Sequence, residues 1–240
     1  MLKWSEESIR YLSDASAYNL SHETLADHVQ AALFPNASIV EGGCGLGYLS
    51  LAMQRRGFCV TSVDCSPLAL AVLRENAQKE RAAVQICAGD VFALPAVARF
   101  DYGLFCFFGD PLQLLAFAKA HCREGIVVLK GAWEAHRFTR SDTPRRFSFA
   151  RSCEALDRLG ISYFAKTIEV DLGQPFRSIP DAVEFFRLYG YDKTPVSGLE
   201  KQLRATERED FPYYLEMIRP VGMIVIRTDD IKNTQQEELK

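Results

Sequence analysis

Residues 38–67 read SIVEGGCGLGYLSLAMQRRGFCVTSVDCSP, and this stretch decides the fold of the chain. It begins with a short apolar run and then has four glycines within six positions. After the glycines, apolar residues recur at the spacing of a helix. A glycine-rich turn between a strand and a helix lets backbone N–H groups approach a ligand closely, because glycine has no Cβ. The stretch therefore predicts either a loop that holds a nucleotide-type cofactor or a tight turn.

The spacing of the glycines separates the candidate ligands. A dinucleotide-binding loop has the pattern G-x-G-x-x-G, but the sixth residue is Tyr48 counted from Gly43 and Ser50 counted from Gly45. A P-loop needs a Lys followed by Ser or Thr, and the stretch has no such pair. The pattern present is E-x-G-x-G-x-G, formed by Glu41, Gly43, Gly45 and Gly47. We interpret the remaining glycine, Gly42, as incidental.

Apolar segments alternate with helical patterns on both sides of this stretch. Ser66 is placed as the N-cap of a helix that begins at Pro67. Short apolar strands separated by helices predict a parallel sheet that is buried on both faces. Strands are expected at 38–42, 59–64, 83–90, 101–108, 125–131, 162–170 and 221–228, and helices within 5–33, at about 46–56, from 67, at about 111–121, near 150–159 and from 178.

We interpret residues 1–240 as a single α/β domain. An N-terminal helical cap covers residues 1–35, and the cofactor-binding core covers 37–131. Residues 132–228 contain an insertion, the substrate-side elements and the last strands, and 229–240 form a tail. Of the aromatic residues in the cap, Trp4 and Tyr11 are expected to pack helices on the sheet, whereas Tyr18 is a candidate for ligand contact.

Composition restricts the class of protein. The chain is 48% hydrophobic and 25% charged, and its net charge of -3 argues against a general nucleic-acid binder. The sequence has neither an apolar run of the ~18–20 residues that would span a bilayer nor an apolar leader, so we expect a cytoplasmic protein that does not enter the membrane. Seven cysteines without a C-x-x-C pair predict reduced thiols and no metal site, with Cys87 and Cys106 buried.

The acid and alternating glycines at the end of the first strand resemble the class I S-adenosylmethionine-dependent methyltransferases. The resemblance covers residues 37–131 and continues more weakly to the last strand. Three further matches follow in register. Asp64 ends the second strand 23 residues after Glu41, Asp90 and Val91 follow the third strand in AGDV, and FDYGLFCFF matches the fourth strand up to Cys106.

The resemblance implies a Rossmann-like fold, in which a seven-stranded, mostly parallel sheet with an antiparallel last strand has helices on both faces. It implies S-adenosylmethionine at the carboxyl edge of the first four strands, with Glu41 near the ammonium group, Asp64 on the ribose and Asp90 on the adenine amino group. Structural alternatives are a surface carboxylate for Glu41, a helix cap for Asp64, a turn cap for Asp90 and a buried thiol for Cys65. The expected cofactor-binding residues are Glu41, Gly43, Gly45, Gly47, Asp64, Cys65, Asp90, Val91, Cys106 and Tyr18.

The end of the fourth strand bears on the methyl acceptor. Members of the family that methylate nucleic-acid amines or glutamine amides commonly have Asn/Asp-Pro-Pro-Tyr/Phe there, whereas this chain has Cys106-Phe107-Phe108-Gly109. We therefore predict methyl transfer to a small molecule at O, N or C. The alternatives are an RNA or protein methyltransferase and a non-catalytic S-adenosylmethionine-binding protein.

Two features after residue 131 are candidates for acceptor chemistry. His136 follows the fifth strand and is a candidate general base, with a surface histidine as the alternative. The loop 137–151 has five arginines and one acid, Asp142. It is either a clamp for an acidic substrate or a solvated loop. The sequence makes no prediction of oligomeric state.

Overall fold

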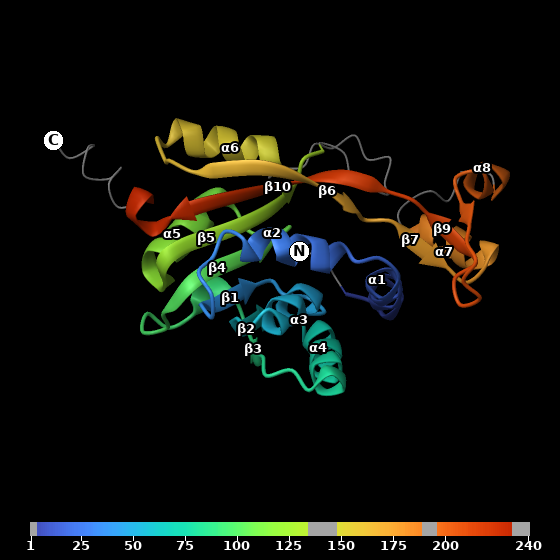
Figure 1. Cartoon of the computed structure of the whole chain (residues 1–240), viewed down its shortest axis with the longest axis horizontal. Coiled ribbons are helices and arrows are strands. Elements are labelled where there is room, and N and C mark those ends of the chain that lie inside the picture. The colour runs from blue at the N-terminus through green and yellow to red at the C-terminus, as the bar shows by residue number, and fades with distance from the viewer. Residues whose placement is uncertain (1–3, 134–147, 189–195, 232–240) are drawn as a thin grey trace.

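The computed structural model describes residues 4–133, 148–188 and 196–231. Its main sheet has seven strands in the order β3-β2-β1-β4-β5-β10-β6 (Figure 1). The first five strands run parallel, and β10 is antiparallel to both of its neighbours, which confirms the predicted fold class. The strands are β1 (Ser38–Gly42), β2 (Cys59–Asp64), β3 (Gln85–Ala88), β4 (Phe100–Cys106), β5 (Cys122–Gly131), β6 (Phe164–Asp171) and β10 (Ile218–Arg227).

Helices cover both faces of this sheet. Leu25 and Val29 of α2 (Ser21–Gln30) share a core with Leu49 and Met53 of α3 (Tyr48–Arg55) on one face. On the other face, a second core contains residues of α5 (Pro111–His121) and α6 (Phe149–Arg158). The helix α4 (Pro67–Glu80) packs against α3 in a smaller cluster. It begins where the sequence predicts, because the Ser66 Oγ accepts a hydrogen bond from the Ala69 N–H at 3.3 Å.

A small second sheet is formed by the chain between β6 and β10 and was not predicted. It has the order β7-β9-β8, and with its two helices we call it the accessory module (Figure 1, right). Its core of Phe176 and Phe185 also takes in Tyr11 of α1 (Glu6–Tyr18). The Tyr11 hydroxyl donates to the Asp181 carbonyl at 2.9 Å, and Arg177 pairs with Asp14. The module contains β7 (Gln174–Phe176), α7 (Ile179–Leu188), α8 (Val196–Glu200), β8 (Arg204–Ala205) and β9 (Tyr213–Leu215).

One cysteine differs from its predicted environment. Cys87 was expected to be buried, but it is exposed because β3 is an edge strand whose residues are largely open to solvent. Cys106, in an inner strand, is partly buried. Among the described helices, none combines the length and apolar character that crossing a membrane requires.

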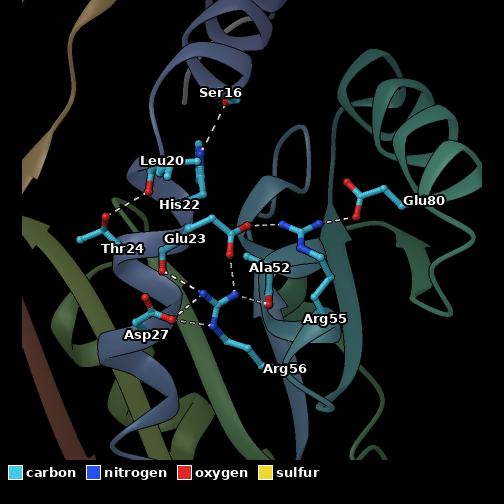
Figure 2. A network of polar contacts seen from close by, with 10 residues as sticks. All are labelled: Ser16, Leu20, His22, Glu23, Thr24, Asp27, Ala52, Arg55, Arg56 and Glu80. Carbon is cyan, nitrogen blue, oxygen red and sulfur yellow. Dashed lines mark hydrogen bonds and ion pairs between the residues drawn. The ribbon is translucent and has the colours of Figure 1, made fainter.

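A network of charges fixes α2 to α3 (Figure 2). Arg56 donates to the Asp27 carboxylate at 2.5 Å, to the Glu23 carboxylate at 2.7 Å and to the Ala52 carbonyl at 2.8 Å. The neighbouring Arg55 binds the same Glu23 and also Glu80 of α4. The network therefore joins the three helices α2, α3 and α4.

We expect Arg56→Met to lower the free energy of unfolding by about 1–3 kcal/mol, because its guanidinium is largely buried and makes several charge-assisted hydrogen bonds. The matched control is Arg123→Met, whose side chain is 56% exposed and pairs with Asp101 at 3.1 Å. That change should cost less than about 1 kcal/mol. Urea denaturation of the two variants measures both values, and equal losses would show that the network does not stabilise the helix pair.

Candidate active site

The predicted ligand-contacting residues gather at one edge of the main sheet. The strands β1, β2, β3 and β4 are parallel, so their carboxyl ends meet there. The chain order reverses between β1 and β4, and open α/β sheets bind ligands outside the carboxyl ends of strands at such a switch point. Glu41, Asp64 and Cys106 lie at the ends of three of these strands, and Asp90 follows the fourth.

The turn after β1 has the conformation that its glycines permit. Gly43, Gly45 and Gly47 have φ values of +68°, +55° and +76°, in the left-handed region. The Gly43 N–H donates to the Val63 carbonyl at 2.8 Å, and the Cys44 N–H donates to the same oxygen at 3.1 Å. These bonds hold the start of the turn against β2.

Asp64 connects this turn to the next one. Its Oδ2 accepts a hydrogen bond from the Gly45 N–H at 2.9 Å, and its Oδ1 accepts from the Ser66 N–H at 2.8 Å. The carboxylate is therefore a structural link between two loops at the sheet edge. Each oxygen of an ionised carboxylate has a second acceptor position, so Asp64 can still bind two hydroxyl groups of a ligand.

Gly42 is required by packing, so its interpretation as incidental is wrong. A Cβ at this position would lie 2.6 Å from Cε1 of Phe105 and 2.9 Å from Cγ1 of Val91. Aromatic rings support the turn from this side. The rings of Phe92, Phe105 and Phe108 stack nearly parallel, with centroids 5.6–6.4 Å apart. These side chains therefore pack closely against the start of the turn and limit its position on the sheet.

Glu41 is deeply buried, with 2% of the residue exposed, so the alternative of a surface carboxylate is wrong. The Ser50 hydroxyl donates to its carboxylate, and the Ser62 hydroxyl donates to Ser50 at 2.6 Å. Loss of solvent raises the pKa of Glu41 to about 7, and the nearby negative charge of Asp64 adds to the shift. No cationic side chain of the described residues pairs with Glu41. It is thus a buried acid whose ionised form would gain from a bound cation.

The residues after β3 are arranged as a capped turn. The Asp90 carboxylate accepts a hydrogen bond from the Phe92 N–H at 2.9 Å and caps a short 3₁₀ turn, Val91–Ala93. The Val91 side chain is buried in the core. Cys65 is exposed and its thiol contacts the Gly89 carbonyl at 3.2 Å, so the alternative of a buried structural thiol is wrong for this residue.

The turn after β4 is held by a buried amine. Lys130, which is 3% exposed, donates from Nζ to the carbonyls of Phe108 and Gly109, at 2.7 Å each. Cys106 ends β4, and burial raises the pKa of its thiol well above the ordinary value. Sequence reasoning missed Lys130, because its partners are main-chain carbonyls that leave no pattern in the sequence.

The N-terminal aromatic residues differ in position. The Tyr18 ring stacks on Tyr214 of the accessory module at 4.5 Å, and the Arg208 guanidinium lies 4.9 Å from the Tyr18 ring centroid. Trp4, by contrast, lies directly against the glycine turn, since a Cβ on Gly45 would be 2.9 Å from its Cζ2. Sequence reasoning preferred Tyr18 and missed Trp4, whose 41-residue separation from Gly45 gives no local signal.

His136 and most of the arginines of 137–151 lie outside the described residues.

Comparison with known proteins finds one matching family. The profile of a family described as a methyltransferase domain matches residues 39–130, which include the ends of β1 to β4. A comparison with curated proteins finds no match of significance.

Solved structures share the fold at low sequence identity. A precorrin 8W decarboxylase of Methanobacterium thermoautotrophicum is 19% identical with a TM-score of 0.51, over 85% of this chain and 88% of that chain. A magnesium protoporphyrin IX methyltransferase of Synechocystis with bound S-adenosylhomocysteine is 14% identical with a TM-score of 0.50, over 86% and 84%. A structure from the conversion of a disulfide bond into a thioacetal group during echinomycin biosynthesis is 15% identical with a TM-score of 0.54, over 95% and 97%.

Proposed function

We propose that this chain is a class I S-adenosylmethionine-dependent methyltransferase that transfers the methyl group of that cofactor to a small-molecule acceptor. The observation that supports the cofactor site best is the buried Glu41 near the end of β1, just before the left-handed glycine turn. An acid with a raised pKa and no cationic partner in the described chain suits the ammonium group of an amino-acid ligand.

The residues at the sheet edge fit the other parts of the cofactor. We assign the ribose hydroxyls to the unused acceptor positions of Asp64 and the adenine amino group to Asp90. We place the amino-acid end of the cofactor along the backbone of the glycine turn, whose left-handed φ values glycine permits. When bound, the cofactor supplies an electrophilic methyl group on sulfur. The protein then holds the acceptor atom in line with it and excludes water.

Three observations favour a small acceptor. The end of β4 has Cys106-Phe107-Phe108 in place of the polar set that is typical of base-amine methylation. The Synechocystis enzyme with this fold is named for a porphyrin. The net charge of -3 does not favour a nucleic-acid surface. The five arginines of 137–151 favour an acceptor with an acidic group.

The seven free cysteines favour a location in the cytoplasm, where thiols stay reduced.

Transfer of a labelled methyl group tests the proposal. The protein is incubated with methyl-tritiated S-adenosylmethionine and, separately, with the small-molecule, RNA and protein fractions of a cell extract. We expect label in the small-molecule fraction only. The control is Gly45→Val, in which the left-handed backbone and the contact with Trp4 leave no room for a side chain, so transfer should be lost.

Other outcomes contradict specific parts of the proposal. Label in the RNA or protein fraction would show that the acceptor is a macromolecule. Binding of S-adenosylhomocysteine without transfer to any fraction would indicate a non-catalytic binding protein. Equal transfer by Gly45→Val would show that the turn does not approach the cofactor.

A further inference from the structure

Phe107, which directly follows β4, combines two unfavourable properties. Phe107 has a φ of +53°, in the left-handed region that bulky side chains rarely adopt. Its large apolar ring is also 42% exposed. A left-handed backbone costs about 1–2 kcal/mol for such a residue, and an exposed ring returns little of that by burial. Folding alone therefore does not explain a phenylalanine here.

The structure around Phe107 imposes this conformation. The Phe107 N–H donates to the Leu129 carbonyl of β5 at 2.8 Å. The buried Lys130 amine binds the carbonyls of the next two residues, Phe108 and Gly109. These three bonds come from the neighbouring strand and hold the strained residue and the two residues that follow it. Strain that is maintained in this way is typical of functional positions.

A second aromatic residue, Trp133, follows β5 and lies beside Phe107. The Trp133 ring lies 6.1 Å from the Phe107 ring at an interplanar angle of 49°. Its position is fixed by the preceding residue, since the Ala132 N–H donates to the Pro220 carbonyl at 3.1 Å. The ends of β4 and β5 thus carry two inclined rings at the same sheet edge as Glu41 and Asp64.

We propose that Phe107, supported by Trp133, determines acceptor specificity by stacking on a flat aromatic or conjugated ring. The proposal rests on the function proposed above, since it concerns the acceptor of that reaction. A planar acceptor lies on the exposed Phe107 face, and its edge meets the inclined Trp133 ring. Such pairs contribute about 0.5–1.5 kcal/mol beyond the area they bury. Lys130 is a positioning residue that fixes the ring before the acceptor binds.

Two probes with the same carbon skeleton test this selectivity. Calorimetry on the full chain saturated with S-adenosylhomocysteine compares 2-naphthol, which is flat, with decahydro-2-naphthol, which is saturated. We expect the wild type to prefer 2-naphthol. Phe107→Leu keeps an apolar side chain but no ring face, so it should bind 2-naphthol about 5–10-fold more weakly, with less than about a twofold change for decahydro-2-naphthol.

A second variant keeps the test decisive if leucine disturbs the turn. Phe107→Gly relieves the left-handed strain, so it should melt at the same or a higher temperature than the wild type while losing the preference for 2-naphthol. Both variants should bind S-adenosylhomocysteine as the wild type does. Equal binding of the two probes by the wild type, or an unchanged preference in both variants, overturns the proposal. Failure of the wild type to bind S-adenosylhomocysteine contradicts the proposed function instead.

Discussion

Asp64→Ala is expected to weaken the binding of S-adenosylhomocysteine by about 100-fold or more. The change removes the proposed contacts with the ribose hydroxyls, and it also removes the acceptor that holds the Gly45 N–H at 2.9 Å. Hydrogen bonds to a charged group contribute about 1.5–3 kcal/mol each. The loss of two such bonds therefore corresponds to an affinity that is about 100-fold weaker or more. Titration calorimetry at pH 7 measures the affinity directly.

A matched carboxylate at the opposite edge of the sheet controls for stability. Asp101 accepts the Ser38 N–H at 2.8 Å and joins the start of β4 to the start of β1, as Asp64 joins two loops at the carboxyl edge. Asp101→Ala should therefore lower the melting temperature without changing cofactor affinity. If both variants lose affinity equally, the effect is general destabilisation. If Asp64→Ala binds normally, Asp64 does not contact the ribose.

Glu41→Gln is expected to change the pH dependence of stability. The pKa of Glu41 is raised from its ordinary value of 4.5 to about 7 in the folded protein. Between these two values the folded state binds more protons than the unfolded state, so stability is lost as pH rises through that window. The shift corresponds to about 3 kcal/mol at pH values above 7. Glutamine cannot ionise, so the variant should lack this loss.

Urea denaturation of the ligand-free protein at pH 5 and pH 8 measures the difference. The wild type should lose about 2.5 kcal/mol more than Glu41→Gln over this range, because part of the effect already occurs below pH 5. The same variant should bind S-adenosylhomocysteine more weakly, because the ammonium loses its counter-charge. Wild-type affinity should rise from pH 5.5 to 7 as Glu41 ionises, whereas that of the variant should stay level. Parallel stability curves for the two proteins would show that Glu41 does not titrate in this window.

Local patterns predicted most of the main sheet and its helices. Ser66 and Pro67 mark the start of α4 in the sequence, and the structure places it there. The accessory strands were missed because β7 and β9 have three residues each, which is too short for an alternating pattern to show.

The missed features of the site depend on distant residues. Gly42 is needed because Phe105, 63 positions later, packs against it. Cys87 is exposed because no strand pairs with the outer edge of β3 in the described sheet, and strand order cannot be read from one segment. The left-handed Phe107 likewise follows from bonds to β5, which the sequence of its own strand does not reveal. The roles of the residues predicted to bind the cofactor stay predictions.

The helix α1 connects the glycine turn with the accessory module. A helix of 13 residues is a stiff rod of about 20 Å. One end is preceded by Trp4 on the glycine turn, with the Ser5–Ser8 capping box fixing the chain direction, and the other end is clamped to the accessory module. The segment that places Trp4 on the glycine turn is thus held, through α1, to the accessory module by the Arg177–Asp14 pair.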